Sequence, residues 1–296
     1  MRLYGNGVLL NGMLQCVTLE KAHGEAAATL TADLFTTLGD TYFQKESLAV
    51  GDAVRLVDDE GTERFLGAVQ ALRRSPQRVR LVACDRGLYL TRNQVHGLFA
   101  GSGGEIVRAA AKLLGLTVGT VDVPDAYRCL SVGTGESAFT LLRRVAGEDR
   151  EISLKGGALT IEKPSGNLYI LPAERILTVE GLADLRPMVN RAVVLDRKGF
   201  VAATAANTGE MNAYGQRQRV LAKQGSDPQT QAREALQGKV IQGSVKLWGN
   251  LNYVCGCAVK LLPSGWGLEG IYRVTAVEHR WEAGLFTTKL TLEGLA

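Results

Sequence analysis

Apolar and polar side chains alternate along several stretches of the first 94 residues. Leu30, Ala32 and Leu34 are separated by Thr31 and Asp33, a period of two that is typical of a strand with one buried face. Further β-type runs cover residues 54–56, 65–73 and 79–84, with turn residues between them. This pattern predicts a meander of strands, suited to a small barrel or sandwich.

The periodicity changes near residue 100. Ser102 and Glu105 have the spacing of a capping box, in which each side chain satisfies a backbone N–H at the start of a helix. We therefore expect a helix from Ile106 to Leu114 and a second one over residues 137–146. A hairpin is expected next, in which residues 152–154 pair with residues 159–161. Together these elements predict a small α+β insert.

Strand patterns return after the insert. Residues 176–179, 191–195 and 286–293 have the composition or the alternation of strands. Residues 203–226 are polar and poorly patterned, so we expect a loop there. Asp227 and Pro228 then begin a short helix, as N-cap and first helical residue, that runs to Gln237.

The first and last β segments resemble each other. In both, a turn glycine precedes each strand in the same order, with Gly51 matching Gly249 and Gly67 matching Gly270. This echo suggests two copies of one β fold. The alternative is that any antiparallel sheet places glycines between its strands.

Composition narrows the class of protein. With 34 basic and 30 acidic residues, the net charge of +4 does not indicate a dedicated nucleic-acid binder. Five scattered cysteines make a disulfide framework improbable and favour folding in a reducing compartment. The N-terminus has no secretory signal pattern, and no apolar stretch is long enough to span a bilayer.

The sequence assigns no catalytic, cofactor-binding or metal-binding residue. Cys255 and Cys257, with His279, are the strongest metal candidates, but a fourth ligand is not evident, and buried cysteines on a strand are the better interpretation. The glycines around Ser102 lack the motif of a phosphate-binding loop. The three tryptophans of the last segment could form a binding platform or part of the core; they are Trp248, Trp266 and Trp281.

Several stretches, taken in order, resemble the baseplate hub proteins of contractile phage tails and phage-like particles, the PBSX-type hub and late-control family. They cover nearly the whole chain: residues 79–85 closing the first β segment, 137–142 and 156–159 in the insert, 188–193, Tyr214-Gly215-x-Arg217, the helix after Asp227-Pro228, 270–279 and 287–292.

This resemblance implies a mainly β fold with an α+β insert. Two similar β-barrel tube domains would cover residues 1–94 and 172–296, and a small lobe would cover residues 95–171. The implied protein is a structural hub and not an enzyme, and it needs no cofactor. Three copies would form a ring that joins the sixfold tail tube to the threefold central spike and continues the channel.

The implied partners are other copies of the chain, the tail tube protein, the central spike, and wedge and tape-measure proteins. DNA would be only a passing cargo, and the location would be the tail baseplate of a particle made in the host cytoplasm. Two other classes stay open: a peptidoglycan hydrolase associated with a phage tail, and a monomeric carbohydrate-binding module that uses the tryptophans.

Overall fold

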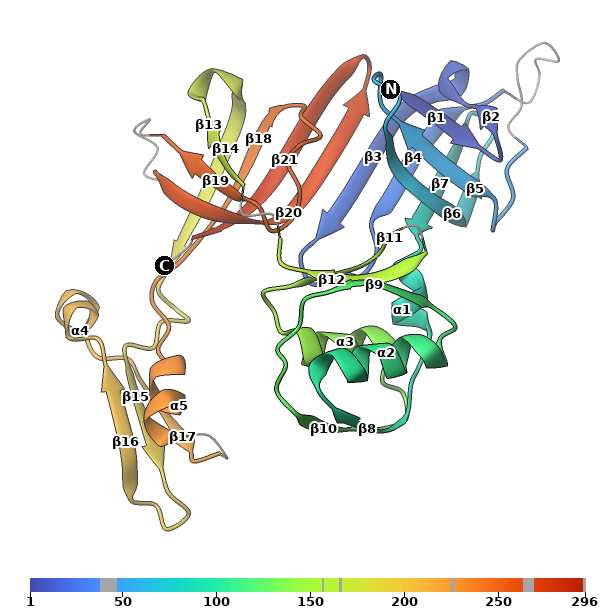
Figure 1. Cartoon of the computed structure of the whole chain (residues 1–296). Coiled ribbons are helices and arrows are strands. Elements are labelled where there is room, and N and C mark those ends of the chain that lie inside the picture. Colours follow the sequence, from blue (N-terminus) through green and yellow to red (C-terminus); the bar gives the residue numbers. More distant parts are fainter. Residues whose placement is uncertain (38–46, 156, 165–166, 225–226, 263–268, 295–296) are drawn as a thin grey trace.

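The computed structural model describes residues 1–37, 47–155, 157–164, 167–224, 227–262 and 269–294. Figure 1 shows a large curled sheet whose two halves lie side by side, with two smaller lobes on the same side of it. Among the described residues the large sheet has 13 strands. The predicted class, mainly β with an α+β insert, is confirmed.

The N-terminal repeat, residues 1–85, forms one half of the sheet. Its apolar core is made by alternate residues of the strands, such as Leu30, Ala32 and Leu34, as the sequence predicts. Its elements are β1 (Arg2–Gly5), β2 (Val8–Leu9), η1 (Asn11–Met13), β3 (Leu14–Ala22), β4 (Thr29–Phe35), β5 (Ala53–Val57), β6 (Glu63–Arg74) and β7 (Arg78–Asp85).

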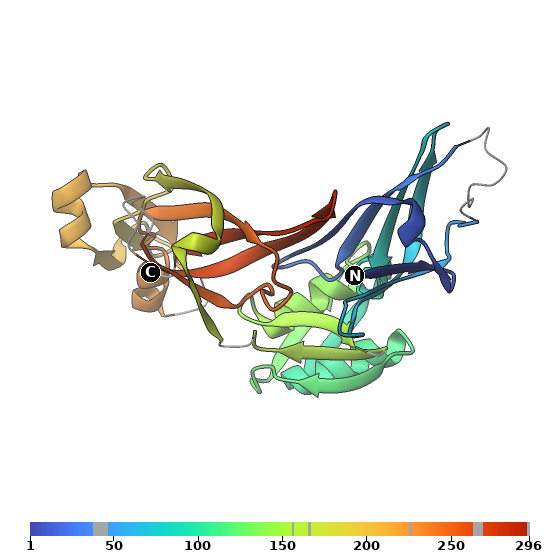
Figure 2. The same cartoon turned by 90° about the horizontal axis from the view of Figure 1, so that it is seen from above.

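The C-terminal repeat forms the other half, around a second core that includes Val245, Val274 and Leu290. Seen from above, it lies beside the N-terminal repeat (Figure 2). Its elements are β13 (Leu168–Leu171), η2 (Ala173–Arg175), β14 (Ile176–Asp184), β18 (Val240–Trp248), β19 (Ala258–Leu261), β20 (Gly270–Glu282) and β21 (Leu285–Gly294).

The two repeats have the same strand order. Across the N-terminal repeat it runs β1-β5-β6-β7-β4-β3, and across the C-terminal repeat it runs β13-β19-β20-β21-β18-β14. The short strand β2, which pairs with β1, has no counterpart. If the other strands are matched in chain order, every pair of neighbours in one repeat is a pair of neighbours in the other. They differ in one direction: β1 is antiparallel to β5, whereas β13 is parallel to β19. The predicted duplication is therefore confirmed in its strand order.

The equivalence extends to single residues. The bulge between Val69 and Ala71 of β6 recurs between Val274 and Ala276 of β20, in each case against the next strand. A bulge inserts one extra residue, so two copies at the same place fix the alignment. Another bulge recurs between the pairs Leu14/Cys16 of β3 and Ile176/Thr178 of β14.

This alignment corrects the predicted glycine matches. Gly51 corresponds to Gly256 and not to Gly249, because both N–H groups donate at 2.8 Å to equivalent carbonyls, those of Val69 and Val274. On the same alignment Gly67 corresponds to Tyr272 and not to Gly270. The sequence repeat that carries this match is Gly-Asp-Ala-Val-Arg-Leu at 51–56 and Gly-Cys-Ala-Val-Lys-Leu at 256–261.

One continuous sheet joins the repeats instead of two separate closed barrels. Strand β20 pairs with β19 through its first residues and with β3 of the other repeat through residues 276–282. Each repeat therefore curls without closing on itself. In the described part of the chain, β14 ends the sheet with one edge that no strand covers.

The α+β lobe, residues 86–162, lies against the N-terminal repeat and has its own core (Figure 2). The capping box is confirmed, since Ser102 accepts from the N–H of Glu105 while Glu105 accepts from the N–H of Ser102. Its elements are α1 (Leu88–Arg92), β8 (Gly97–Gly101), α2 (Gly103–Leu113), β9 (Thr117–Val121), β10 (Arg128–Val132), α3 (Ala138–Ala146), β11 (Glu151–Lys155) and β12 (Ala158–Glu162).

The two helices of this lobe pack on the predicted hairpin. Ile152 pairs with Ile161, and both lie in one core with α2 and α3. The lobe ends earlier than predicted. Strand β13 falls within the range predicted for the insert, yet it pairs with β19 in the large sheet.

A second lobe, residues 185–239, lies between β14 and β18, where the sequence predicted a loop over residues 203–226. That prediction is wrong: most of this range is regular structure, and α5 packs on a three-stranded sheet around Ala192, Val194 and Ala232. Its elements are β15 (Arg191–Leu195), β16 (Val201–Ala206), α4 (Thr208–Tyr214), β17 (Gln218–Ala222) and α5 (Pro228–Glu234). Asp227 caps α5 as predicted, but the helix ends before Gln237.

We predict that Gly256→Ala destabilises the fold more than Gly51→Ala. Both glycines have positive φ, 83° and 96°, so each change costs about 1–2 kcal/mol of backbone strain. A Cβ on Gly256 would in addition overlap the ring of Pro164, whereas nothing lies within 4 Å of one on Gly51. Chemical denaturation of both variants measures the difference. Equal losses of stability in the two variants would show that Pro164 moves aside at little energetic cost.

Candidate functional site

The large sheet has one polar face, opposite the two cores. In β4 the polar-face residues Thr29, Thr31 and Asp33 alternate with buried apolar residues. The same alternation in β20 places Glu278 and Arg280 on this face. Such alternation is typical of antiparallel sheets with one solvated side.

Rows of polar side chains cross from one repeat to the other on this face. Thr31 pairs with Thr18, Thr18 with Arg280, and Arg280 with Thr287, so four adjacent strands contribute to one row. The first two residues belong to the N-terminal repeat and the last two to the C-terminal repeat. The polar face is therefore continuous across the joint between β3 and β20.

Two close ion pairs lie on the polar face. Arg78 forms a bidentate contact with Asp33, with 2.9 Å between Nε and Oδ1, and Arg280 contacts Glu282 at 3.0 and 3.1 Å. Each hydrogen bond raises the pKa of its arginine and so favours the charged pair. The carboxylates therefore neutralise these two arginines, which weakens the positive field that would hold nucleic acid.

Two carboxylates meet at the joint itself. Glu20 of β3 lies directly opposite Glu278 of β20. Partial burial raises the pKa of Glu20, and the neighbouring charges of Glu278 and Glu25 raise it further. Like charges placed directly opposite each other destabilise a strand pair.

We predict that Glu20→Gln raises the free energy of unfolding at neutral pH by about 0.2–1 kcal/mol. The folded-state pKa of Glu20 lies above its usual 4.5, so its ionisation costs stability as the pH rises through that folded value. Below pH 4.5 the gain should vanish. Glu282→Gln, which removes a carboxylate paired with Arg280, is the matched control and should not stabilise. Denaturation at both pH values checks this; a gain from Glu282→Gln would contradict it.

The joint also holds the α+β lobe in place. Lys21 of β3 forms an ion pair with Glu151 of β11, and the His23 ring contacts the carbonyl of Glu148 at 2.7 Å. The Cys255 thiol donates to the carbonyl of Lys21 at 2.8 Å. Two repeats and one lobe therefore converge on the end of β3.

Cys255 and Cys257 are buried, as expected, but they lie in the turn before β19 and not on a strand. Burial raises the pKa of the Cys255 thiol to about 12, so it stays protonated and is a poor nucleophile or metal ligand. Within the described ranges no three side chains of His, Cys, Asp or Glu gather as a metal site. That this cysteine pair binds no metal stays a prediction.

His279 is buried beneath the sheet, where its Nδ1 lies 3.0 Å from the hydroxyl of Thr288. The same hydroxyl accepts from the N–H of Asn250 at 3.1 Å. Burial lowers the pKa of His279 to about 4, because the charged ring would lose its hydration there. The ring is therefore neutral at physiological pH, and its role in the C-terminal repeat is structural.

We predict that acid destabilises the protein through His279. Its pKa is about 4 when folded and 6.5 when unfolded, so the unfolded state binds the proton first. Stability should fall by up to about 3 kcal/mol as the pH drops from 6.5 to 4. His279→Gln should flatten this part of the curve, measured by denaturation at several pH values. If stability depends on pH in the same way in the variant, other groups cause the acid sensitivity.

The tryptophans do not form one platform. Trp281 stacks on Phe286 with ring centroids 4.4 Å apart and packs against the N-terminal core. Trp248 is 48% exposed and lies opposite Thr287, the residue after Phe286, so it is on the other face of the sheet. Trp266 lies outside the described residues. Ser102 and its glycines serve as the cap of α2.

No protein-family model matches this sequence, and no curated protein sequence matches it significantly. Solved structures do match. The prophage MuSo2 43 kDa tail protein from Shewanella oneidensis superposes with a TM-score of 0.76 at 14% identity, covering 98% of this chain and 96% of that one. The tail protein from Neisseria meningitidis MC58 follows with 0.70 at 13% identity, covering 99% and 95%.

The fold is that of phage tail proteins. A third structure with this tail-protein fold is the E. coli c3393 protein, described as a component of the type VI secretion system with structural similarity to the T4 bacteriophage tail proteins gp27 and gp5. Its TM-score is 0.60 at 10% identity, with 100% of this chain and 77% of that chain covered. The predicted resemblance to baseplate hub proteins is thus confirmed at the level of the fold. No described helix is long and apolar enough to cross a membrane.

Proposed function

We propose that this chain is a structural baseplate hub of a contractile tail. Three copies form a ring that joins the sixfold tail tube to the threefold central spike and continues the channel between them. The observation that carries this proposal is the joint between β3 and β20, which unites two repeats of one strand order in a single sheet.

A ring would form if a contact like the joint between β3 and β20 were repeated between chains. The first repeat contributes β3, and the second contributes β20; the second repeat also has β14, the counterpart of β3, at the end of the sheet. A contact of the same kind between chains is heterologous, and heterologous contacts close into rings when their rotation allows it. Three chains with two repeats each present six similar units to a sixfold partner.

The polar face suits the wall of a channel. Two of its arginines are paired with carboxylates of the same face, Arg78 with Asp33 and Arg280 with Glu282. DNA is held mainly by basic side chains that replace its counterions, and paired arginines contribute little to that. A polyanion would therefore pass this surface without being retained, in keeping with DNA as a passing cargo.

The rest of the assignment follows from the ring. Its partners are the tail tube protein, the central spike, and wedge and tape-measure proteins, and its place is the tail baseplate. The first tube-type domain would be the N-terminal repeat, the insert would be the α+β lobe, and the second tube-type domain would be the C-terminal repeat together with the second lobe. The tail proteins with similar structures support a structural role and not an enzymatic one.

Two other classes are tested by the same experiment: a peptidoglycan hydrolase associated with a phage tail, and a monomeric carbohydrate-binding module. For the second class, exposed Trp248 would be the first contact to examine. Either class predicts activity from a single chain, whereas the hub requires assembly.

We predict that the full chain forms a trimer and has no activity on cell walls. Light scattering over a concentration series should approach three times the mass of the chain, and images of the concentrated protein should show a ring with a central opening. Purified peptidoglycan should release no soluble fragments. A monomer at every concentration that cleaves peptidoglycan or binds glycans would overturn the hub proposal.

A further inference from the structure

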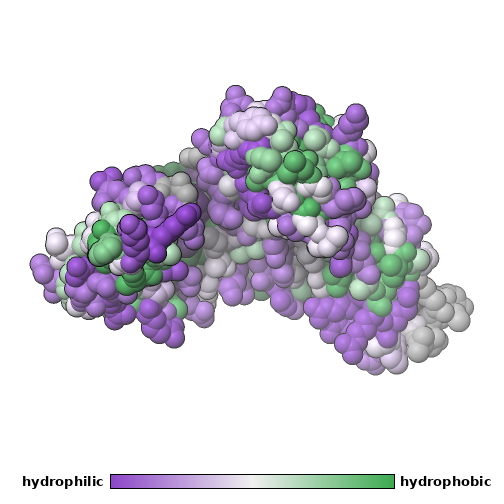
Figure 3. Space-filling view, turned by 90° about the horizontal axis from the view of Figure 1, so that it is seen from below, coloured by the Kyte–Doolittle hydropathy of each residue, from purple (hydrophilic) through white to green (hydrophobic). Residues whose placement is uncertain are grey.

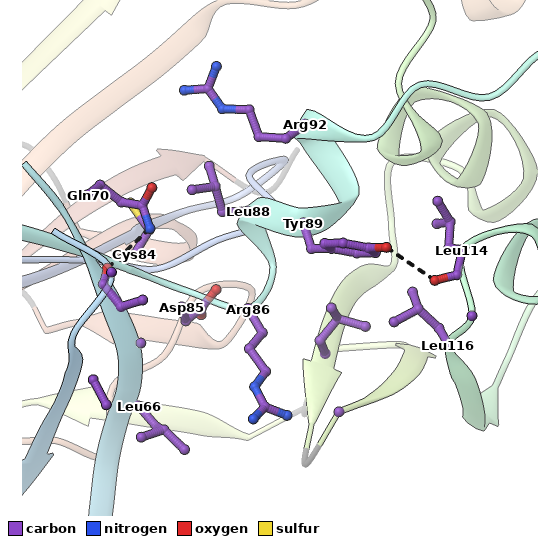
Figure 4. A pocket seen from close by; sticks show the side chains of 17 residues that line it. Leu66, Gln70, Cys84, Asp85, Arg86, Leu88, Tyr89, Arg92, Leu114 and Leu116 are labelled. Atoms are coloured by element: carbon purple, nitrogen blue, oxygen red, sulfur yellow. Dashed lines mark hydrogen bonds between the residues drawn. The ribbon is translucent and has the colours of Figure 1, made fainter. Parts of the chain in front are cut away.

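A groove of about 710 Å³ separates β6 from the α+β lobe. Leu66 and Gln70 of β6 line one side, and Leu114 and Leu116 line the other, as Figure 4 shows. On the lobe side, the Tyr89 hydroxyl of α1 donates to the carbonyl of Leu114 at 3.2 Å. Leu66 remains 43% exposed in this groove.

The equivalent place in the C-terminal repeat is filled. Thr275, the counterpart of Gln70, accepts from the N–H of His23 at 2.6 Å, just beyond the end of β3. Gly256, the counterpart of Gly51 in the groove lining, is covered by Pro164. The end of β3 and the chain after β12 thus occupy in one repeat a space that is open in the other.

The repeat alignment says what could fill the open space. Strand β14 corresponds to β3 through their shared bulge, and β6 corresponds to β20. Glu20 pairs with Glu278 at the existing joint, and their counterparts are Leu182 and Arg73. In the described part of the chain, β5 pairs with β6 no further than Ala68, and no strand follows it along that edge.

We infer that the groove beside β6 receives the end of β14 from a neighbouring copy of this chain. This inference rests on the proposed ring and specifies its joint. Residues 182–184 of one chain extend the edge of β6 at residues 71–73 of the next, with Leu182 opposite Arg73. Leu185, the counterpart of His23, then enters the groove beside Gln70.

The surfaces fit this pairing. Leu182 is 51% exposed on an edge strand, a feature that favours pairing with another chain. Arg73 is also exposed, and in this register Glu180 and Asp184 flank it on the same face. Asp184 already contacts Arg186 of its own chain at 2.7 Å, so Glu180 is the carboxylate that would pair with Arg73. Leu185 therefore meets the apolar groove, and the carboxylate of Glu180 meets a basic strand end. Figure 3 views the molecule from the side on which the two lobes lie and shows apolar side chains on the surface of both. The lobes therefore also expose apolar surface that a neighbour could bury.

Disulfide cross-linking of the full chain tests the register. In a Cys129→Ser background, which removes the exposed native thiol, Arg73→Cys with Leu182→Cys should yield covalent trimers on oxidation. Arg73→Cys with Glu180→Cys, displaced by two residues, should yield far fewer. Glu20→Cys with Glu278→Cys is the positive control and should close within each chain.

A groove variant tests the occupant. Leu66→Glu places a charge where the neighbour would bury it and should weaken trimer formation at least about tenfold. Leu98→Glu, at a leucine that is 70% exposed on β8 outside the groove, should change it little. A trimer that forms without the Arg73–Leu182 cross-link and tolerates Leu66→Glu overturns this joint but leaves the ring standing. A chain that stays monomeric even when concentrated and oxidised overturns both.

Discussion

The structure depends on the pairing of β3 with β20. Among the residues that the structure describes, this ladder is the one place where the two repeats share a sheet, and the end of β3 also holds the α+β lobe through Lys21 and Glu151. Backbone groups of an open edge must find partners, and here each repeat provides them for the other. The ladder tolerates Glu20 opposite Glu278, which shows that backbone pairing and the flanking cores outweigh a local repulsion.

Local patterns predicted most elements because they have local causes. The capping box of Ser102 and Glu105, and Asp227 before Pro228, were readable because a helix start is decided within four residues. The strands and helix within residues 203–226 of the second lobe were missed for the opposite reason. The strands of this lobe are built largely from alanine and exposed polar residues, so residues 201–206 show little contrast between buried and exposed positions.

The repeat was predictable but was matched at the wrong residues. Turn glycines are common in any β protein, so Gly249 was as good a match for Gly51 as Gly256. The four-residue run Ala-Val-Arg-Leu at 53–56, repeated as Ala-Val-Lys-Leu at 258–261, carries more information because it includes the strand. The polar face followed from alternation alone. Its continuity did not, since it requires knowing that β3 pairs with β20, which lie at opposite ends of the chain.

Similar repeats with different insertions can connect partners of different symmetry. The matched strands and bulges give the two halves one geometry, so a ring of three chains would repeat that geometry six times. The insertions break the repetition: the α+β lobe follows the N-terminal repeat, whereas the second lobe interrupts the C-terminal repeat between β14 and β18. Both lobes lie on the same side of the sheet (Figure 1). That side of the ring would alternate between two kinds of lobe and be strictly threefold, while the sheet itself stays close to sixfold. Threefold and sixfold partners would thus meet different parts of one chain, and neither would have to distort.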